Sequence, residues 1–352
     1  MIKITIGITI YNRKKTLERM IASLYASNLK EAGMDYFIRV YDDCSDEFSE
    51  EDIRKMFPEN IEYFRHERNQ GSDYNIGFMY RHFLETGDDV LFNCDSDLMF
   101  EKKWLNEGLK YLKETDGILS LFNTKSHEIK ELRDELCVKD TIGSAGTLMT
   151  REAVEIICSH IDESQTKVAL DHNWCSLYRS LGRKIYSTRK SYVQHIGING
   201  FNSSSTAMDI GENFEVDSIV NGRILGDVLH DVIAQRNTVS EKKKGLFFLF
   251  PFDRIRPGKS VVIYGLGEVG QDYRKQLESI DYCKEIILVD KNYKNLSGVE
   301  NPKILKSISC DYVLIAAHFD SVRKEMRKTI LEFNPQLEEK LIDDACNPIR
   351  IN

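Results

Sequence analysis

The chain has 352 residues, which exceeds the usual size of one domain and suits two. Hydrophobic residues make up 41% and charged residues 30%, a composition that excludes a mostly disordered chain. The formal net charge of −8 argues against a general polyanion-binding protein, so we expect no nucleic-acid partner.

The eight cysteines never occur as C-x-x-C pairs and lie mostly inside apolar runs. This usage is typical of reduced, buried thiols and argues against a disulfide framework or a zinc site. The longest strongly apolar run, residues 246–252, is too short to span a bilayer. The first ten residues, MIKITIGITI, form a β-rich run without the cleavage site of a signal peptide. We therefore expect a strand here and not a signal peptide. We therefore expect a cytoplasmic protein.

Strands and helices alternate along the first part of the chain. The expected elements are, in order, a strand at 2–10, a helix at 13–27, a strand at 36–41, a helix at 50–56, a strand at 61–65, a helix at 74–84 and a strand at 89–93. This alternation indicates a mostly parallel sheet with helices on both faces. Acidic residues follow two of the strands, at 42–43 and 95–97, where such sheets bind ligands.

The pattern loosens after residue 199, and a helix is expected at 219–234. A second α/β unit begins near Lys259, with further strands at 286–290 and 310–317 and a helix at 321–333. We therefore predict three parts, which are a first domain at 1–200, a loop and helical connector at 201–257 and a small Rossmann-like βαβ domain at 258–352.

The first 200 residues contain six short motifs, which are ITIYNR (8–13), YDDCSDE (41–47), NQGSDYNIG (69–77), NCDSDLMF (93–100), LDHNW (170–174) and QHIG (194–197). In order and in spacing, these motifs resemble those of a family 2 glycosyltransferase of the GT-A fold. The resemblance implies an α/β fold with a mixed nucleotide-sugar-binding sheet flanked by helices. It also implies metal-dependent, inverting sugar transfer from a nucleotide-sugar donor, with a UDP-sugar favoured. The acceptor would be a glycan or lipid-linked glycan in bacterial surface polysaccharide or capsule assembly.

Asp95, Ser96 and Asp97 form a D-x-D motif at a predicted strand end. A nucleoside diphosphate leaving group needs charge compensation, and a divalent cation held by oxygen ligands provides it. The resemblance implies Mn²⁺ or Mg²⁺ held by Asp95 and Asp97, with Asp97 the more direct ligand, His195 as a third ligand and Ser96 at the nucleotide. The alternatives are a helix-capping turn for the carboxylates and a structural role for the histidine.

The resemblance also implies a nucleoside site at Thr9, Tyr11 and Asp43. A carboxylate can accept a hydrogen bond from a uracil N–H, and a tyrosine can cover the ring. Arg68 and Asn69 would approach the diphosphate or the nucleoside. The alternatives are strand packing for Thr9, a solvated turn for Asp43 and a surface loop for 68–69.

Asp171 is the candidate catalytic base that takes the proton of the acceptor hydroxyl. By resemblance, the base lies just before a helix, here expected at 173–180. Many family members carry a further acid before it, whereas this chain has Leu170. The alternative is that Asp171 is the N-cap of that helix. One base acting in one direct displacement would invert the anomeric centre.

Gly265, Gly267 and Gly270 form G-x-G-x-x-G between a predicted strand and a helix, and Asp290 follows 290 − 270 = 20 residues later. This pattern is typical of a dinucleotide site, with NAD as the ligand. The domain has only about a hundred residues and no evident pair for hydride transfer. We therefore favour a structural or interaction role over a bound nucleotide.

The segment EKKKGLFFLFPFDRIRPGK (241–259) combines lysines with phenylalanines. It would suit peripheral contact at the inner face of the membrane, but we favour aromatic packing between domains or in a homo-oligomer.

Two other functions stay open. A sugar-phosphate nucleotidyltransferase usually needs a glycine-rich turn after the first strand, which this chain lacks. A non-catalytic nucleotide- or NAD-binding protein would have no need of Asp95, Asp97 and Asp171 together.

Overall fold

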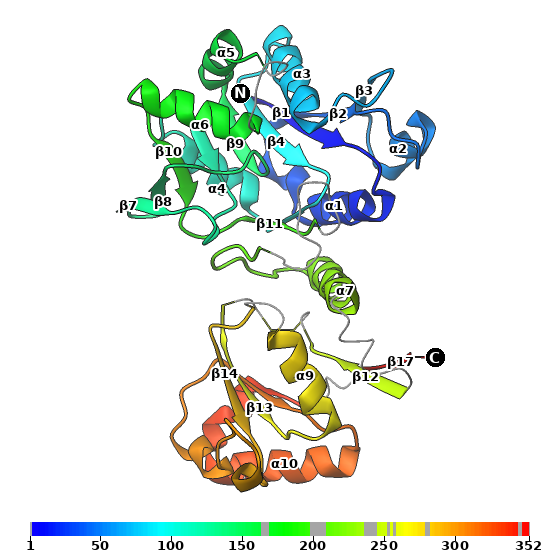
Figure 1. The fold of residues 1–352 in the computed structure, drawn as a ribbon, viewed down its shortest axis with the longest axis vertical. Coiled ribbons are helices and arrows are strands. Elements are labelled where there is room, and N and C mark those ends of the chain that lie inside the picture. Colours follow the sequence, from blue (N-terminus) through cyan, green and yellow to red (C-terminus); the bar gives the residue numbers. More distant parts are fainter. Residues whose placement is uncertain are drawn as a thin grey trace. The chain divides into compact units, whose positions relative to one another are not determined.

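The computed structural model describes residues 2–162, 169–197, 209–235, 245–251, 254–255, 258–278, 282–343 and 347–351. The chain forms two compact units (Figure 1). The first consists of Met1–Gly197 and Gly211–Asn221, and the second of Ile198–Ile210 and Gly222–Asn352. The helix α7 (Ile219–Gln235), expected at 219–234, contains the boundary between them. The serines at 203–205 and the lysines at 242–244 lie outside the described residues.

The first unit is built on a nine-stranded mixed sheet in the order β3-β2-β1-β4-β9-β6-β10-β8-β7. Strands β3, β2, β1 and β4 are parallel, whereas β9 is antiparallel to both β4 and β6. The strands are β1 (Lys3–Ile10), β2 (Asp35–Asp42), β3 (Glu62–Arg65), β4 (Val90–Asp95), β6 (Ile118–Ser120), β7 (Ile129–Arg133), β8 (Leu136–Lys139), β9 (Thr147–Thr150) and β10 (Ile185–Thr188). The carboxyl ends of β1, β2 and β4 therefore meet at one edge.

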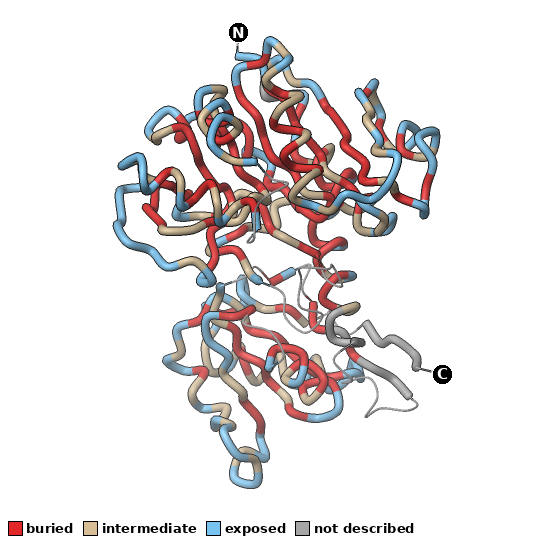
Figure 2. The backbone as a smooth tube through the Cα atoms, turned by 45° about the horizontal axis from the view of Figure 1, so that its top comes forward, coloured by how far each residue is buried: buried red, intermediate tan, exposed pale blue. Residues whose placement is uncertain are grey.

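Helices cover both faces of this sheet, and its central strands β1 and β4 are buried (Figure 2). One apolar cluster joins β1 to Leu17 of α1 and Leu109 of α4, and the other joins β4 to Met79 of α3 and Trp174 of α6. The helices are α1 (Lys14–Ala26), α2 (Glu50–Met56), α3 (Ser72–Glu85), α4 (Trp104–Leu112), α5 (Arg151–His160) and α6 (Leu170–Ser180), with the 3₁₀ helix η1 (Leu29–Ala32). The α/β fold class is thus as predicted.

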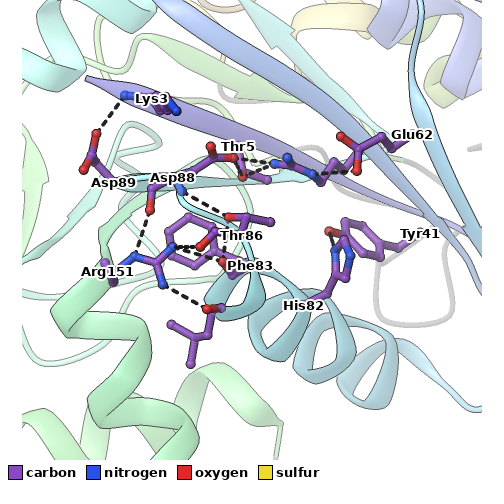
Figure 3. A network of polar contacts seen from close by, with 12 residues as sticks. Lys3, Thr5, Tyr41, Glu62, His82, Phe83, Thr86, Asp88, Asp89 and Arg151 are labelled. Carbon is purple, nitrogen blue, oxygen red and sulfur yellow. Dashed lines mark hydrogen bonds and ion pairs between the residues drawn. The ribbon is translucent and has the colours of Figure 1, made fainter. Parts of the chain in front are cut away.

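A buried polar network links the amino-terminal parts of β1, β2 and β4 (Figure 3). Nη1 of Arg39 lies 2.6 Å from Oδ2 of Asp88, and the hydroxyl of Thr5 donates to the same oxygen at 2.7 Å. Arg151 donates to four carbonyl groups at and just beyond the end of α3. Because these contacts lie away from the carboxyl ends, they stabilise the sheet without occupying its ligand-binding edge.

The second unit contains a four-stranded parallel sheet in the order β14-β13-β15-β16. Its strands are β13 (Ser260–Tyr264), β14 (Glu285–Val289), β15 (Tyr312–Ile315) and β16 (Leu341–Ile342). Its helices are α9 (Glu268–Glu278) and α10 (Asp320–Phe333), with the 3₁₀ helices η3 (Tyr293–Asn295), η4 (Pro302–Lys306) and η5 (Pro335–Lys340). Strand–helix alternation around a parallel sheet is the arrangement that the sequence predicted for this region.

The phenylalanine-rich segment forms β12 (Gly245–Leu249), which pairs with β17 (Asn347–Ile351). Phe248 and Phe250 are buried, and their amides donate to Asp272 and Gln276 of α9. These two rings therefore pack inside the second unit and not between domains. Membrane or oligomer contact by other parts of the segment stays a prediction. No helix in the described part of the chain is long and apolar enough to cross a bilayer.

Candidate metal and donor site

Asp95, Asp97 and His195 meet at the carboxyl end of β4. Asp95 is the last residue of β4, and the chain then turns into β5 (Leu98–Phe100). Strand β11 (Val193–His195) pairs antiparallel with β5 and sets His195 opposite Leu98. One ligand atom from each of the three side chains lies within 4.8 Å of the others. The predicted ligand set is thus brought together by two strands far apart in the sequence.

The geometry of this cluster suits a divalent cation. Nε2 of His195 lies 3.1 Å from Oδ1 of Asp97, and that buried oxygen has no hydrogen bond of good geometry among the described residues. A Cβ atom on Gly197 would lie 2.1 Å from Oδ2 of Asp97, so only glycine lets the chain pass there. Two carboxylates and an imidazole are donors that Mn²⁺ accepts, and Mg²⁺ accepts the oxygens best.

The electrostatics of the three groups are coupled. Burial raises the pKa of Asp95 well above its usual range, and the charge of Asp97 adds to that rise. Burial would also raise the pKa of Asp97, but His195 and Arg13 outweigh it and hold that pKa low. Burial disfavours the charged imidazole, yet Asp97 raises the pKa of His195 above its ordinary value. The cluster therefore holds negative charge at a cost in desolvation, which a bound cation would offset.

Two buried side chains behind the cluster orient Asp95. The amide of Asn93 donates to Oδ1 of Asp95 at 3.2 Å, and the hydroxyl of Tyr80 donates to Oδ1 of Asn93 at 3.1 Å. Asn93 is fully buried and Tyr80, on α3, almost so. Partners of this kind fix the direction of a ligating carboxylate. Neither residue was predicted from the sequence.

Arg13 is a further site residue that the sequence analysis missed. Its guanidinium contacts Oδ2 of Asp97. Asn12 and Arg13 both have left-handed backbone conformations, and the Asn12 side chain accepts hydrogen bonds from the amides of Asp46 and Glu47. This turn directs Arg13 across the carboxyl end of β1. The sequence signal that could have identified Arg13 was a basic residue three positions after the end of a strand, at the ligand-binding edge.

The structure places two of the predicted donor-binding residues along β1 and its end. Thr9 is partly buried and lies between Tyr41 of β2 and Asp95 of β4 in the strand register. Tyr11 follows β1 and is 46% exposed, so its ring is accessible to a ligand. Ser96, between the two aspartates, is buried.

Asp43 anchors the loop that carries the other predicted donor residues. It is 3% exposed, and its two oxygens accept hydrogen bonds from the amides of Gln70 at 2.7 Å and Gly71 at 2.8 Å. Burial raises the pKa of Asp43, and these amides oppose the rise. Arg68 and Asn69 are exposed just before these amides. Asp43 therefore determines where the 68–69 segment lies at this edge.

Asp171 lies in the first turn of α6 and is partly buried. The N-cap is Ala169, so the alternative in which Asp171 caps the helix is wrong, because α6 begins earlier than expected. Asp73 of α3 accepts a hydrogen bond from the amide of Leu170. The charge of Asp171 also contributes to the raised pKa of Asp95, so the two carboxylates belong to one electrostatic environment.

The glycine motif of the second unit joins β13 to α9, and Asp290 follows β14. Oδ2 of Asp290 accepts a hydrogen bond from the amide of Leu266, inside the motif, at 2.7 Å. The strand–turn–helix context that the motif requires is therefore present.

Residues 5–163 of the first unit match the family model described as Glycosyl transferase family 2. A search of curated proteins finds no significant match.

Three solved structures are similar to the chain at low identity. S. aureus TarS 1–349 aligns with 13% identity and a TM-score of 0.40, over 67% of this chain and 66% of that one. GalNAc-T7 with UDP, GalNAc and Mn²⁺ aligns with 13% identity and a TM-score of 0.45, over 55% and 43%. PcManGT, a mannosyltransferase from Pyrobaculum calidifontis in complex with GDP-Man and Mn²⁺, aligns with 12% identity and a TM-score of 0.42, over 66% and 64%.

Proposed function

We propose that the protein is a metal-dependent, inverting glycosyltransferase that uses a UDP-sugar. Its acceptor is a hydroxyl of a glycan or lipid-linked glycan in bacterial surface polysaccharide assembly. The observation that carries the proposal is the cluster of Asp95, Asp97 and His195 at the carboxyl end of β4. Asp95 and Asp97 lie within residues 5–163, which match the family 2 model.

Asp97 and His195 hold the cation, and Asp95 completes its ligand set. When bound, Mn²⁺ or Mg²⁺ acts as a Lewis acid on the diphosphate leaving group. The hydrogen bonds from Tyr80 to Asn93 and from Asn93 to Asp95 keep that carboxylate in one orientation. This rigidity limits the reorganisation needed as negative charge develops on the leaving group.

Asp171 is the base in this mechanism. It takes the proton of the acceptor hydroxyl while the oxygen attacks the anomeric carbon from the face opposite the nucleotide. The bond to the diphosphate breaks in the same step, so the product has the inverted configuration.

The nucleoside is recognised beside the cation. Tyr11 covers the base and Thr9 lines the floor of the site, and Asp43 accepts a hydrogen bond from the base. Each carboxylate oxygen of Asp43 has a second lone pair beyond the one used by the amide of Gln70 or Gly71. Arg68 and Asn69 approach the diphosphate from the loop that Asp43 anchors.

The test is calorimetric titration of UDP and GDP into the full chain, with and without Mn²⁺. We expect UDP to bind only with Mn²⁺, and Asp97→Ala to abolish this binding. Asp46→Ala is the matched control, since Asp46 is an exposed aspartate in the neighbouring loop. UDP binding that is indifferent to both Mn²⁺ and Asp97→Ala would overturn the metal assignment, and tighter GDP binding would overturn the choice of donor.

A further inference from the structure

The second unit contains a cavity at the point where its sheet changes winding direction. Strand β13 has β14 on one side and β15 on the other, and all three are parallel. The chain after β13 and the chain after β15 therefore diverge from neighbouring carboxyl ends. In open parallel sheets, ligands bind in the crevice at such a point.

The cavity has a volume of ≈ 1010 Å³, which is ample for a dinucleotide. It is lined by the three segments that follow β13, β14 and β15 and by one side of α10. The lining residues used below are Gly265, Gly267, Glu268, Asp290, Phe319 and Glu325. All of them belong to the second unit, so this site is separate from the Asp95–Asp97–His195 cluster.

The backbone geometry requires glycine at two of the three positions of the motif but not at the third. A Cβ atom on Gly270 would lie 1.9 Å from the carbonyl oxygen of Gly265, and Gly265 itself has a φ of +103°. Both positions need glycine to make the turn. A Cβ atom on Gly267 would meet no heavy atom within 4 Å, and its φ is outside the left-handed region. Protein packing therefore does not require glycine at 267, and the space above it opens into the cavity.

Gly267 is also the residue directly before α9, and its carbonyl accepts a hydrogen bond from the amide of Gln271. Within the described chain the amide of Gly267 donates to no partner, whereas the amide of Leu266 donates to Asp290. A phosphate group above Gly267 would meet this amide and the electropositive end of an 11-residue helix.

Asp290 connects the glycine turn to the chain after β14. Its Oδ2 accepts from the amide of Leu266 at 2.7 Å, and its Oδ1 accepts from the amide of Asn292 at 2.7 Å. Each oxygen retains a lone pair for a ribose hydroxyl. The carboxylate also disfavours a ligand that carries a phosphate at the ribose 2′ position, because like charges would meet in a partly desolvated site.

The remaining wall is apolar and exposed. Phe319 is 69% exposed and Val322 is 40% exposed, and both line the cavity. An accessible aromatic ring at the edge of a cavity offers a flat surface for a planar ligand group. A ligand that combines a phosphate, a ribose and a planar ring would use all three walls.

The charges of the lining select among such ligands. Glu268, Asp290 and Glu325 are acidic, and Lys291 is the one lysine or arginine among the lining residues. A nucleoside diphosphate would bring several uncompensated negative charges. In NAD⁺ the nicotinamide cation cancels one of the two phosphate charges, so its net charge is lower. The acidic lining therefore favours NAD⁺ over UDP or ADP.

We propose that the second unit binds an NAD-type dinucleotide. Its pyrophosphate lies at Gly267 and the start of α9, its adenosine ribose at Asp290 and one of its rings against Phe319. We favour this over the structural or interaction role expected from the sequence, because the cavity lies at the carboxyl ends of the parallel strands and is lined by the glycine motif and Asp290. The proposal does not depend on the glycosyltransferase activity.

The experiment is a calorimetric titration of NAD⁺, NADP⁺ and UDP into the full chain carrying Asp97→Ala, with a chelator in place of divalent metal. Under these conditions the first unit should not bind UDP. We expect saturable NAD⁺ binding, with NADP⁺ weaker by about tenfold or more. Absence of NAD⁺ binding up to millimolar concentration, or UDP binding tighter than NAD⁺, would overturn the proposal whatever the outcome for the first unit.

Gly267→Asp is the diagnostic variant. Aspartate is a favourable N-cap residue, so this change should preserve or raise the thermal unfolding midpoint. Its carboxylate would occupy the place of the phosphate, and we expect NAD⁺ affinity to fall by about tenfold or more. Gly87→Asp, at an open glycine of the first unit, is the matched control and should bind NAD⁺ normally. Unchanged affinity in folded Gly267→Asp would refute the assignment.

Discussion

Nε2 of His195 lies 3.1 Å from Oδ1 of Asp97, across the antiparallel ribbon of β5 and β11. The amide of Ile196 also donates to the carbonyl of Asp97 at 2.8 Å, so backbone and side chain make the same connection. The two strands of this ribbon come from distant parts of the chain. The proposed metal site is therefore complete only when the segment around 195 has folded onto the segment around 97.

Replacement of His195 tests this connection. His195→Ala removes an imidazole ligand, and we expect Mn²⁺ affinity in the presence of UDP to fall by at least about tenfold, since even outer partners of metal ligands contribute roughly 10- to 100-fold. The measurement is a calorimetric Mn²⁺ titration. The control is His160→Ala, because His160 is exposed at the end of α5. Equal losses in both variants would exclude His195 as a ligand.

Replacement of Asp171 separates donor binding from chemistry. Asp171→Asn keeps the side-chain shape but cannot take a proton, so we expect kcat to fall by about a hundredfold or more while UDP affinity is retained. The measurement compares UDP release in the presence of acceptor with UDP binding by calorimetry. The Asp73→Asn variant, which alters the partner of the Leu170 amide, should have a smaller effect. Near-normal kcat in Asp171→Asn would show that another group is the base.

Replacement of Arg39 addresses stability alone. Arg39→Met leaves Asp88 buried without its charged partner, and we expect the free energy of unfolding to fall by about 3–5 kcal/mol. Lys55→Met breaks an exposed pair with Glu51 and should cost no more than about 1 kcal/mol. Urea unfolding gives both values. If Arg39→Met also abolished Mn²⁺-dependent UDP binding in the folded protein, the network would not be independent of the site.

Glu101 makes stability depend on pH. It accepts hydrogen bonds from Lys190 at 2.8 Å and from the amide of Glu215 at 2.6 Å. Burial raises the pKa of Glu101 from 4.5 to about 7, more than Lys190 lowers it. Below pH 4.5 the group is protonated in both states, whereas between pH 4.5 and about 7 it ionises first in the unfolded chain. Stability from this group is therefore present at low pH and is lost as pH rises through about 7.

The corresponding measurement is urea unfolding at about pH 5 and about pH 8, in the wild type and in Glu101→Gln. The wild type should lose up to about 3 kcal/mol more than the variant over this range. Parallel pH profiles for the two proteins would show that Glu101 does not titrate in this window.

The parallel half of the first sheet could be predicted from the sequence, because β1, β2 and β4 are strands of six to eight residues, rich in apolar side chains and separated by helical patterns. The antiparallel half could not. Strands β6, β8, β9 and β10 have three or four residues each, too few for a period to appear. Strand β7, IKELR, is exposed along its whole length and lacks the alternation that marks a half-buried strand.

The residues of the candidate site also divide into those that could be predicted from the sequence and those that could not. Asp95, Asp97 and His195 were predicted as one ligand set, and their side chains do meet. Arg13, Asn93 and Tyr80 were missed because their importance depends on where a left-handed turn and the α3 face direct them. Likewise, the acidity of the cavity in the second unit depends on which of its charged side chains the fold brings to one edge.

Strand β9 is antiparallel to both of its neighbours and divides the nine-stranded sheet into two parts. Everything on the β4 side of the sheet comes from one uninterrupted stretch of chain, and the strands beyond β9 come from a later stretch. Of the three proposed ligands, only His195 follows these later strands in the sequence. A chimera that exchanges residues 118–188 with a related chain would keep all three ligands but replace Asp171, so the exchange would separate metal binding from the proposed base.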